Sequence, residues 1–254
     1  MLRGIDISHH QKGIDLGAVL PNIDFLIAKA TEGIDWTDDK CDNFIQQVIS
    51  AGKPFGYYHF ASNNDPVAEC DYFIRETQGY LHKGIPILDW EGVYRNGQKV
   101  YDQSVSWVNE WVRHFADVTG VWPWIYGNPW RFNQGGVERN CGRWIAKYPN
   151  VSRPAIDYYP GEPPEVDGLV CAWQFASDGM VPGYDGNLDV NIFYGGTDAW
   201  NAYAGNFIEP EPEPEPEPTP EPEPEPEPEP TPEPEAEEHV IFEDNDFKIT
   251  LEEK

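Results

Sequence analysis

Two carboxylates separated by one residue, Asp89 and Glu91, close an apolar run that begins at Ile85. Side chains on a β-strand alternate between its two faces, so both carboxylates are expected on one face and Trp90 on the other. Two carboxyls this close cannot ionise independently, and one is expected to keep its proton. A proton donor beside a retained negative charge is what cleavage of a glycosidic bond requires. The end of an exposed acidic strand would give the same pattern, so the motif needs support from the rest of the chain.

The composition divides the chain of 254 residues into two unlike parts. Residues 1–208 are rich in Trp, Tyr, Phe and Gly, whereas residues 209–235 are almost entirely Pro and Glu. The net charge is −28, and the segment from Glu209 onward holds 19 acidic residues against 2 basic ones, which leaves −11 for the first 208 residues. A part of this length suits one domain with a sizeable core. Its negative charge argues against a nucleic-acid partner, and no apolar run is long enough to predict a membrane span.

Eight short apolar segments are predicted to be strands. They are residues 2–7, 25–30, 54–60, 85–91, 121–126, 143–148, 169–175 and 188–193. Helical patterns separate several of the early strands: residues 38–51 place Phe44, Val48 and Ile49 on one side, and further patterns follow at 65–80 and 102–119. This alternation predicts an α/β fold with a parallel sheet and helices outside it. After Tyr126 the connections are rich in Gly and Pro, so the prediction is a TIM-like barrel of the form (β/α)5(β)3.

In such a barrel the functional residues lie at the carboxyl ends of the strands. Polar and aromatic side chains recur where the predicted strands end, although the strand interiors are apolar. These positions are Asp6, Lys29, Tyr58, Asp89 with Glu91, Tyr126, Tyr148, Trp173 and Asp189. The pattern predicts an enzyme cleft.

Eight blocks of the sequence, in order, resemble glycoside hydrolase family 25, the lysozymes of the fungal and phage muramidase type. The blocks are Gly4-Ile5-Asp6-Ile7-Ser8, Ala28-Lys29-Ala30-Thr31-Glu32-Gly33, Gly56-Tyr57-Tyr58-His59-Phe60, Asp89-Trp90-Glu91, Ile125-Tyr126, Trp144-Ile145-Ala146, Trp173-Gln174-Phe175 and Leu188-Asp189-Val190-Asn191. The resemblance covers roughly residues 2–203 and implies a barrel of eight strands and five helices. It also implies an activity without a cofactor: hydrolysis of the β-1,4 bond between N-acetylmuramic acid and N-acetylglucosamine in bacterial peptidoglycan.

The resemblance assigns expected roles to four acidic residues. Glu91 corresponds to the general acid, and Asp89 to the group that assists the substrate's 2-acetamido group in its attack on the anomeric carbon, a substrate-assisted route. Asp6 and Asp189 lie on the first and last strands, which meet when a barrel closes. Together they would hold negative potential near the positive charge that develops on the sugar.

Substrate binding is expected to involve three aromatic residues and one lysine. Tyr58, Tyr126 and Trp173 would stack on sugar rings or form hydrogen bonds to the acetamido group, as their family counterparts do. The alternative for each is an ordinary core aromatic. Lys29 would pair with a cleft carboxylate and hold it ionised, and the alternative is a surface lysine.

Histidine and cysteine residues give no sign of a metal site. The six histidines lack metal-ligand spacing, no C-x-x-C motif occurs, and no Ser-His-Asp order is present. The four cysteines are expected to be buried thiols, with a disulfide left as an alternative.

The domain boundaries follow the composition. Residues 1–207 are predicted to form the catalytic barrel, residues 208–235 an extended Pro/Glu linker, and residues 236–254 a short tail. Residues 240–251 resemble a β-hairpin with its turn around 244–246. The tail is interpreted as a docking or self-association segment, with a truncated wall-binding module as the alternative.

The start of the sequence shows no signal-peptide pattern. We therefore expect synthesis in the cytoplasm and action on the bacterial cell wall after release, as for a phage endolysin. Export by another route and a missing leader are the alternatives. Two rival functions are a barrel that binds wall glycan without cutting it, and a glycosidase of another N-acetylglucosamine polymer such as chitin. The presence of all four acids argues against the first, and the flanking blocks argue against the second.

Overall fold

The computed structural model describes residues 1–206 together with the strands at 239–244 and 247–251. The chain divides into two compact units, Met1–Ile208 and Glu209–Lys254. In the second unit, β12 (His239–Asp244) pairs antiparallel with β13 (Phe247–Leu251). The predicted linker at 208–235 lies outside the described residues.

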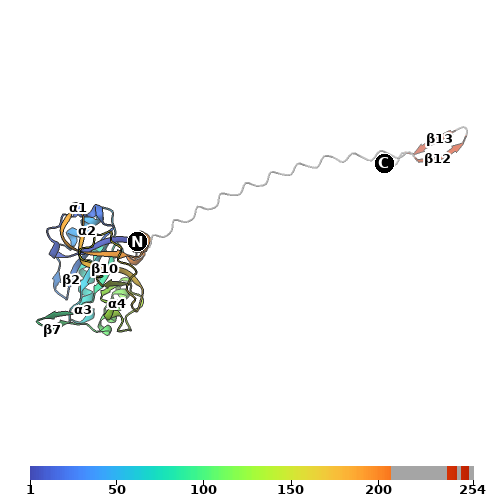
Figure 1. Ribbon diagram of the computed structural model, residues 1–254. Helices are drawn as coiled ribbons and strands as arrows, with labels where there is room; N and C mark the ends of the chain where they lie inside the picture. Colours follow the sequence, from blue (N-terminus) through green and yellow to red (C-terminus); the bar gives the residue numbers. More distant parts are fainter. Residues whose placement is uncertain (207–238, 245–246, 252–254) are drawn as a thin grey trace. The chain divides into compact units, whose positions relative to one another are not determined.

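The first unit is a closed barrel of eight strands (Figure 1). Its strands are β1 (Leu2–Ile7), β2 (Phe25–Glu32), β4 (Phe55–Phe60), β5 (Ile85–Asp89), β8 (Trp124–Gly127), β9 (Arg143–Ala146), β10 (Val170–Val181) and β11 (Tyr184–Phe193). Around the barrel they follow the order β1-β11-β10-β9-β8-β5-β4-β2, and β2 pairs with β1 to close the ring. The predicted barrel is therefore confirmed.

One strand of the barrel runs against the others. β11 pairs antiparallel with both β10 and β1, and Asp189 is the register partner of Asp6. The expectation that Asp189 lies at the carboxyl end of a strand is wrong. It lies near the middle of β11, at the start of the part that pairs with β1, and the reversed direction of that strand brings it to the rim where β1 ends.

Six α-helices connect or follow the strands. They are α1 (Leu16–Val19), α2 (Cys41–Ser50), α3 (Pro66–Thr77), α4 (Val105–Thr119), α5 (Pro129–Phe132) and α6 (Thr197–Tyr203), with single 3₁₀ turns at His9–Gln11, Leu20–Asn22 and Gln78–Tyr80. Helix α4 begins with Ser104, whose side chain accepts a hydrogen bond from the Trp107 N–H, and ends at Gly120 in the left-handed conformation. The predicted face of α2 is partly wrong, because Ile49 is exposed and Ile45 is buried in its place. None of the helices in residues 1–206 is long and apolar enough to cross a membrane.

Alternation along each strand separates two apolar layers. In β5, Ile85 and Ile87 belong to the cluster inside the barrel, whereas Leu88, and Trp90 just after the strand, join the larger cluster that also includes helix residues. The inner column of β5 continues from Ile85 and Ile87 to Asp89, so the barrel interior changes from apolar to acidic at its carboxyl end. Trp200 of α6 belongs to the inner cluster, packs on Phe25, and donates its indole N–H to the Phe55 carbonyl (3.1 Å).

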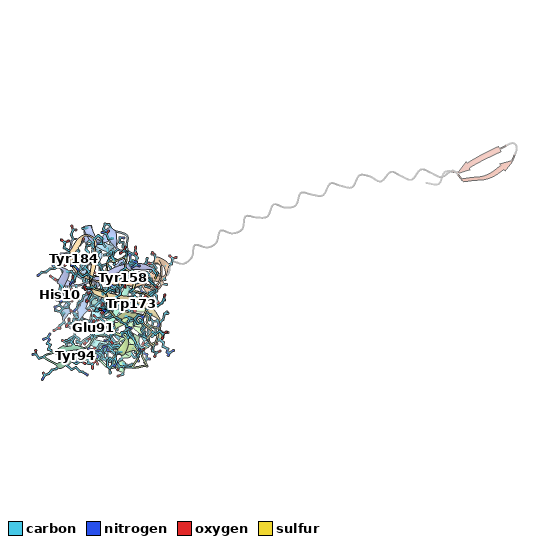
Figure 2. All side chains as sticks on the ribbon, in the orientation of Figure 1. His10, Glu91, Tyr94, Tyr158, Trp173 and Tyr184 are labelled. Atoms are coloured by element: carbon cyan, nitrogen blue, oxygen red, sulfur yellow. The ribbon has the colours of Figure 1, made fainter. Side chains whose placement is uncertain are left out.

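Three short strands of the barrel unit lie outside the ring. β3 (Trp36–Thr37) pairs with the end of β2, and β6 (Val93–Arg95) pairs with β7 (Gln98–Tyr101) in a separate hairpin. This hairpin follows β5 directly and projects from the body of the unit, with the exposed Tyr94 on it (Figure 2).

The loop after β4 is held by a buried carboxylate on α3. Glu69 accepts hydrogen bonds from the backbone N–H groups of Ser62 (2.9 Å) and Asn64 (3.0 Å) and from His59 Nε2 (3.0 Å). Burial lowers the pKa of His59, so the ring is neutral, donates through Nε2 and accepts at Nδ1 from Thr31 (2.8 Å). Burial alone would raise the pKa of Glu69, but the hydrogen bonds from His59 and Ser62 lower it.

We expect Glu69→Gln to lower the free energy of unfolding by about 1–3 kcal/mol at pH 7, because an amide cannot accept all of these hydrogen bonds. The folded-state pKa of Glu69 is depressed, so its contribution is present above the ordinary carboxyl pKa and is lost as the pH falls through the folded-state value. The difference between wild type and variant should therefore shrink at acidic pH. Urea unfolding at pH 7 and pH 4 measures this. Glu76→Gln, a partly exposed position on the same helix, is the control and should change stability by less than about 0.5 kcal/mol. An equal loss of unfolding free energy at both pH values would contradict the inference that Glu69 is ionised in the folded protein.

Candidate active site

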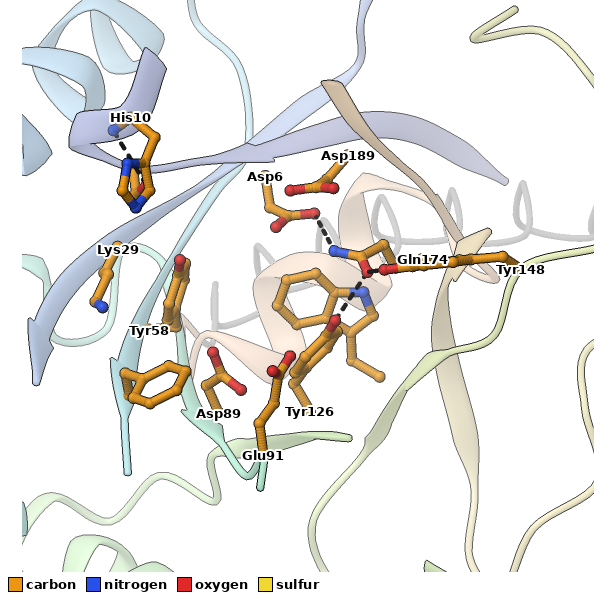
Figure 3. Close-up of a pocket in the computed structure, with 13 residues that line it drawn as sticks. Asp6, His10, Lys29, Tyr58, Asp89, Glu91, Tyr126, Tyr148, Gln174 and Asp189 are labelled. Atoms are coloured by element: carbon orange, nitrogen blue, oxygen red, sulfur yellow. Dashed lines mark hydrogen bonds between the residues drawn. The ribbon is translucent and has the colours of Figure 1, made fainter. Parts of the chain in front are cut away.

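A cavity of about 280 Å³ opens at the carboxyl end of the barrel (Figure 3). It is lined by Asp6, Ser8, His10, Lys29, Tyr58, Phe60, Asp89, Glu91, Tyr126, Trp144, Tyr148, Gln174 and Asp189. Seven of the eight predicted site residues are in this set, and Trp173 is the exception. We call this cavity the cleft.

The carboxyls of Asp89 and Glu91 lie side by side in the cleft, where the inward-facing side of β5 reaches the carboxyl end of the barrel (Figure 3). The strand itself ends at Asp89, so the prediction that it reaches residue 91 is wrong. The chain stays extended for one more residue, because the Trp90 N–H donates to the Tyr126 carbonyl (2.9 Å). Trp90 is fully buried on the opposite side, which leaves both carboxyls facing the cleft as alternation predicts.

Burial raises the pKa of both carboxyls. For Asp89 the pKa lies well above its usual value, and the charge of Glu91 adds to the effect of burial. Burial also raises the pKa of Glu91, against the nearby Tyr126 hydroxyl and the positive charges of Arg131 and Lys29. Two carboxyls that both favour the neutral form, and that repel each other when ionised, hold one shared proton over a wide pH range.

One oxygen of this pair lacks a partner. Asp89 Oδ1 is buried and has no hydrogen-bond partner among the residues that the structure describes. An ionised carboxylate oxygen in such a place is costly unless a donor reaches it. The cleft therefore offers a position for a ligand N–H or O–H at Asp89.

Asp6 is held by two amide side chains. Its Oδ2 accepts hydrogen bonds from Gln174 Nε2 (2.9 Å) and Asn191 Nδ2 (2.7 Å). The Asn191 oxygen accepts from the Trp144 indole (2.8 Å), which fixes its amide group toward Asp6. The Gln174 oxygen accepts the hydroxyl protons of Tyr126 (2.8 Å) and Tyr148 (2.7 Å), so Gln174 joins three walls of the cleft (Figure 3).

Asp6 and Asp189 differ in how their charge is stabilised. Burial raises the pKa of Asp6 to about 6, with the hydrogen bonds from Gln174 and Asn191 opposing the shift. Burial and the charges of Asp6 and Glu91 raise the pKa of Asp189 to about 8, with no opposing hydrogen bond. Near neutral pH, Asp6 is thus the more readily ionised of the two.

Tyr58 and Lys29 lie on the same wall of the cleft (Figure 3). Burial and the neighbouring Asp89 raise the pKa of the Tyr58 hydroxyl, so it remains a neutral donor. The Lys29 ammonium pairs with Glu32 (2.7 Å) and lies over the rings of Trp36 and Phe60. The expected salt bridge between Lys29 and a cleft carboxylate is therefore wrong, although its positive charge still lowers the pKa of Asp89.

Trp173 is a core residue and not part of the cleft. It is buried, packs against Phe175 in the outer apolar layer, and donates its indole N–H to the Lys147 carbonyl (2.6 Å). Gln174, the next residue, has the inward position that was predicted for Trp173.

Sequence reasoning missed several cleft residues, namely Ser8, His10, Phe60, Trp144, Tyr148 and Gln174 as binding groups. The signal for Gln174 is a polar residue between two large apolar ones in a buried strand. Tyr148 lies at the end of a predicted strand, which is the signal that the sequence gives for it. Ser8 and His10 belong to the turn after β1, and the sequence gives no periodic signal for them.

The described residues hold no group of three or more His, Cys, Asp or Glu side chains arranged for a metal ion. Cys41, Cys70, Cys141 and Cys171 are all buried and unpaired with each other. The chemistry that the cleft offers is that of carboxyls and hydroxyls: a proton on the Asp89–Glu91 pair, an acceptor at Asp89 Oδ1, a negative charge on Asp6 near neutral pH, and a second acidic group at Asp189.

Comparison with known families gives one match over most of the barrel. Residues 5–184 match the family described as glycosyl hydrolases family 25.

Individual relatives agree with this match. The chain is 28% identical over 198 residues to the autolytic lysozyme of Clostridium acetobutylicum, which covers 76% of this chain and 56% of that protein. It is 32% identical over 216 residues to the N,O-diacetylmuramidase of Arthroderma benhamiae, covering 80% and 86% of the two chains. The crystal structure of the bacterial lysozyme from Streptomyces coelicolor is similar with a TM-score of 0.67 and 26% identity, over 81% of this chain and 97% of that one. The chain thus spans less than two thirds of the first of these relatives and nearly all of the solved lysozyme.

We expect Asp189→Asn to stabilise the fold at alkaline pH. The folded-state pKa of Asp189 is raised from 3.8 to about 8, so this residue's stabilising contribution is fully present below about pH 4 and is lost as the pH rises through the folded-state value. Relative to wild type, the variant should gain roughly 1 kcal/mol in unfolding free energy at pH 8.5 and little at pH 4. Urea unfolding at the two pH values checks this. Asp185→Asn, at an exposed position of the same strand, is the control and should show no such gain. If the variant were no more stable than wild type at pH 8.5, the inference that ionised Asp189 destabilises the fold would be wrong.

Proposed function

The chain belongs to glycosyl hydrolases family 25, and from this membership we propose that it is a lysozyme that hydrolyses the β-1,4 bond between N-acetylmuramic acid and N-acetylglucosamine in bacterial peptidoglycan. The observation that carries the proposal is the Asp89–Glu91 pair at the carboxyl end of the barrel, in which Asp89 is buried and its Oδ1 has no partner among the described residues. Glu91 is the general acid, and Asp89 assists the acetamido group of the substrate.

Substrate binding decides which carboxyl of the pair holds the proton. In the free protein, burial favours the neutral form of Asp89, whose Oδ1 has no donor within reach. The N–H of a 2-acetamido group is such a donor, and its hydrogen bond stabilises the ionised form of Asp89. The shared proton then resides on Glu91, where it can be given to the leaving oxygen.

Bond cleavage follows from this proton position. Glu91 gives its proton to the glycosidic oxygen while the bond from that oxygen to the anomeric carbon breaks. The acetamido carbonyl oxygen forms a bond to the same carbon, and Asp89 stabilises the positive charge on the resulting oxazolinium ring. Glu91, now a carboxylate, accepts a proton from a water molecule whose oxygen bonds to the anomeric carbon as the ring opens.

The other cleft residues supply binding and electrostatic support. Asp6 is ionised near neutral pH and holds a negative charge close to the sugar carbon as positive charge develops on it. Tyr58 keeps its proton and can donate it in a hydrogen bond to the sugar or its acetamido group. Tyr126 also keeps its proton but donates to Gln174, so its oxygen can accept a hydrogen bond from the sugar. Asp189, across from Asp6 in the β-ladder, adds a second acidic group at the floor of the cleft.

The site of action and the role of residues 236–254 also belong to the proposed function. We propose release to the bacterial cell wall in the manner of a phage endolysin, with residues 236–254 as a docking or self-association segment. Comparing sedimentation of the full chain over a range of concentrations tests self-association, since a monomer throughout would contradict it.

The test of the proposed function is the release of reducing ends from purified peptidoglycan. We expect wild type to release reducing muramic acid ends, and Glu91→Gln to lose roughly a hundredfold or more of this activity, because an amide cannot give up the proton. Glu110→Gln, at an exposed position on α4, is the matched control and should retain activity.

Two other outcomes would replace the proposal. Reducing glucosamine ends would mean that the cleft cuts the other bond of the polymer. No release by wild type, combined with tight pelleting on cell walls, would make the barrel a glycan-binding module.

A further inference from the structure

Arg131 is a buried cation that lies against the cleft without lining it. It belongs to the short helix α5, its exposed fraction is 3%, and the mechanism above gives it no role. A guanidinium is rarely buried this deeply unless its contacts or its charge are used.

The contacts of Arg131 lie on both sides of Glu91 in the chain. Its Cζ atom is 4.9 Å from the centre of the Trp90 ring, in the geometry of a cation–π contact. Its Nη2 atom lies 2.7 Å from the point that a Cβ at Gly92 would occupy, so only a glycine fits there without moving the guanidinium. The same Nη2 donates to Asp102 Oδ1 (3.0 Å), just beyond the β6–β7 hairpin.

Two nitrogen donors of Arg131 make no hydrogen bond to the residues that the structure describes. Nε and Nη1 are buried and have no hydrogen-bond partner among the described residues. Leaving charged donors unsatisfied costs free energy, so packing alone is a poor reason for an arginine at this position.

Glu91 depends on contacts of this kind because it lies past the end of β5. Asp89 is fixed by the sheet, with Phe60 and Tyr126 as its register partners on either side. Glu91 has no such register partners, so the position of its carboxyl depends on the residues that flank it and on the nearby Tyr126 hydroxyl.

We propose that Arg131 is a positioning residue for Glu91: its guanidinium holds the segment from Trp90 to Gly92 so that the Glu91 carboxyl stays in the cleft beside Asp89. The inference rests on the proposed function for the role of Glu91 as general acid, but the contacts themselves do not depend on it.

The charge of Arg131 gives the proposal a second readout. It lowers the pKa of Glu91 against the effect of burial. The other titratable groups that face Glu91 are the carboxyls of Asp6, Asp89 and Asp189, the ammonium of Lys29, and the hydroxyls of Tyr58, Tyr126 and Tyr148. The cations that lower the pKa of Glu91 are Arg131 and Lys29, and Lys29 is paired with Glu32. Removing Arg131 should therefore raise the pKa of Glu91 and shift the alkaline limb of the activity profile to higher pH.

The experiment compares Arg131→Gln with Arg131→Lys. Carboxyl ¹³C NMR of protein labelled at glutamate, with the Glu91 signal assigned through Glu91→Gln, gives the pKa of Glu91 without requiring activity. We expect Arg131→Gln to raise it by roughly one pH unit and Arg131→Lys to leave it nearly unchanged. On soluble glycan fragments, Arg131→Gln should lose roughly tenfold to a hundredfold in kcat with little change in KM, because the acid is displaced and the rest of the cleft is intact.

Two further variants separate position from charge. Gly92→Ala removes no titratable group but displaces the guanidinium of Arg131, and we expect kcat to fall roughly tenfold. Asp102→Asn removes the partner of Arg131 and keeps its charge, so it should not move the alkaline limb upward. Circular dichroism and thermal melting identify any variant that fails to fold, and in that case Arg131→Lys and Gly92→Ala decide the matter.

Specific results would overturn the proposal. An unchanged Glu91 titration in Arg131→Gln, or wild-type kcat in Gly92→Ala, would show that Arg131 only fills space. If wild type cleaves no glycan, the proposed function fails, but the NMR titration still decides whether Arg131 acts on Glu91.

Discussion

The antiparallel pairing of β1 with β11 is the constraint on which the cleft depends. Because β11 runs against the other strands, the middle of this last strand meets the carboxyl end of the first, and Asp189 stands opposite Asp6. The same register places Asn191 two residues farther along, within reach of Asp6 Oδ2. A slip of one residue would turn Val190 inward and Asn191 outward, so the register of one strand pair fixes two acids and one of their supporting amides.

The polar network of the cleft and the apolar interior beneath it work together. Asp6 can ionise because Gln174 and Asn191 both donate to one of its oxygens, and each amide is oriented by another partner. The inner cluster, which includes Trp124, Trp144 and Trp200, excludes water from the lower barrel, and this burial raises the pKa of each of the four acids. An arrangement that favours proton retention on buried carboxyls weakens the fold at alkaline pH, which is a common relation between active sites and stability.

The sequence predicts the barrel and most of the cleft, and the exceptions have physical reasons. Strand alternation predicts correctly that Asp89 and Glu91 lie on one face, because two residues separated by only one other are positioned by local geometry alone. The prediction that Trp173, and not Gln174, faces the cleft is wrong because barrel strands are apolar on both faces, so composition does not tell the inside from the outside. The direction of β11 was missed since pairing direction depends on partners far away in the chain. The spacing of residues does not reveal Arg131, because its contacts come from two segments, residues 90–92 and Asp102, that lie far from it in the chain.

The tryptophan between the two carboxylates explains how an acid outside the sheet can be held in place. Trp90 is anchored on every side: its backbone N–H donates to Tyr126, its indole N–H donates to the Gln103 carbonyl (2.9 Å), its ring meets the edge of Phe132, and Arg131 covers its face. None of these contacts involves the carboxyl of Glu91, so the cleft side of that residue stays free for a substrate. A carboxyl fixed directly by hydrogen bonds would be held as firmly, but those bonds would stabilise its ionised form and oppose the protonated state that a general acid needs. Holding Glu91 through its buried neighbour limits that conflict: the Tyr126 hydroxyl and the charge of Arg131 lower the pKa of Glu91, but burial outweighs them and raises it. The residue that points away from the cleft therefore matters to the chemistry inside it.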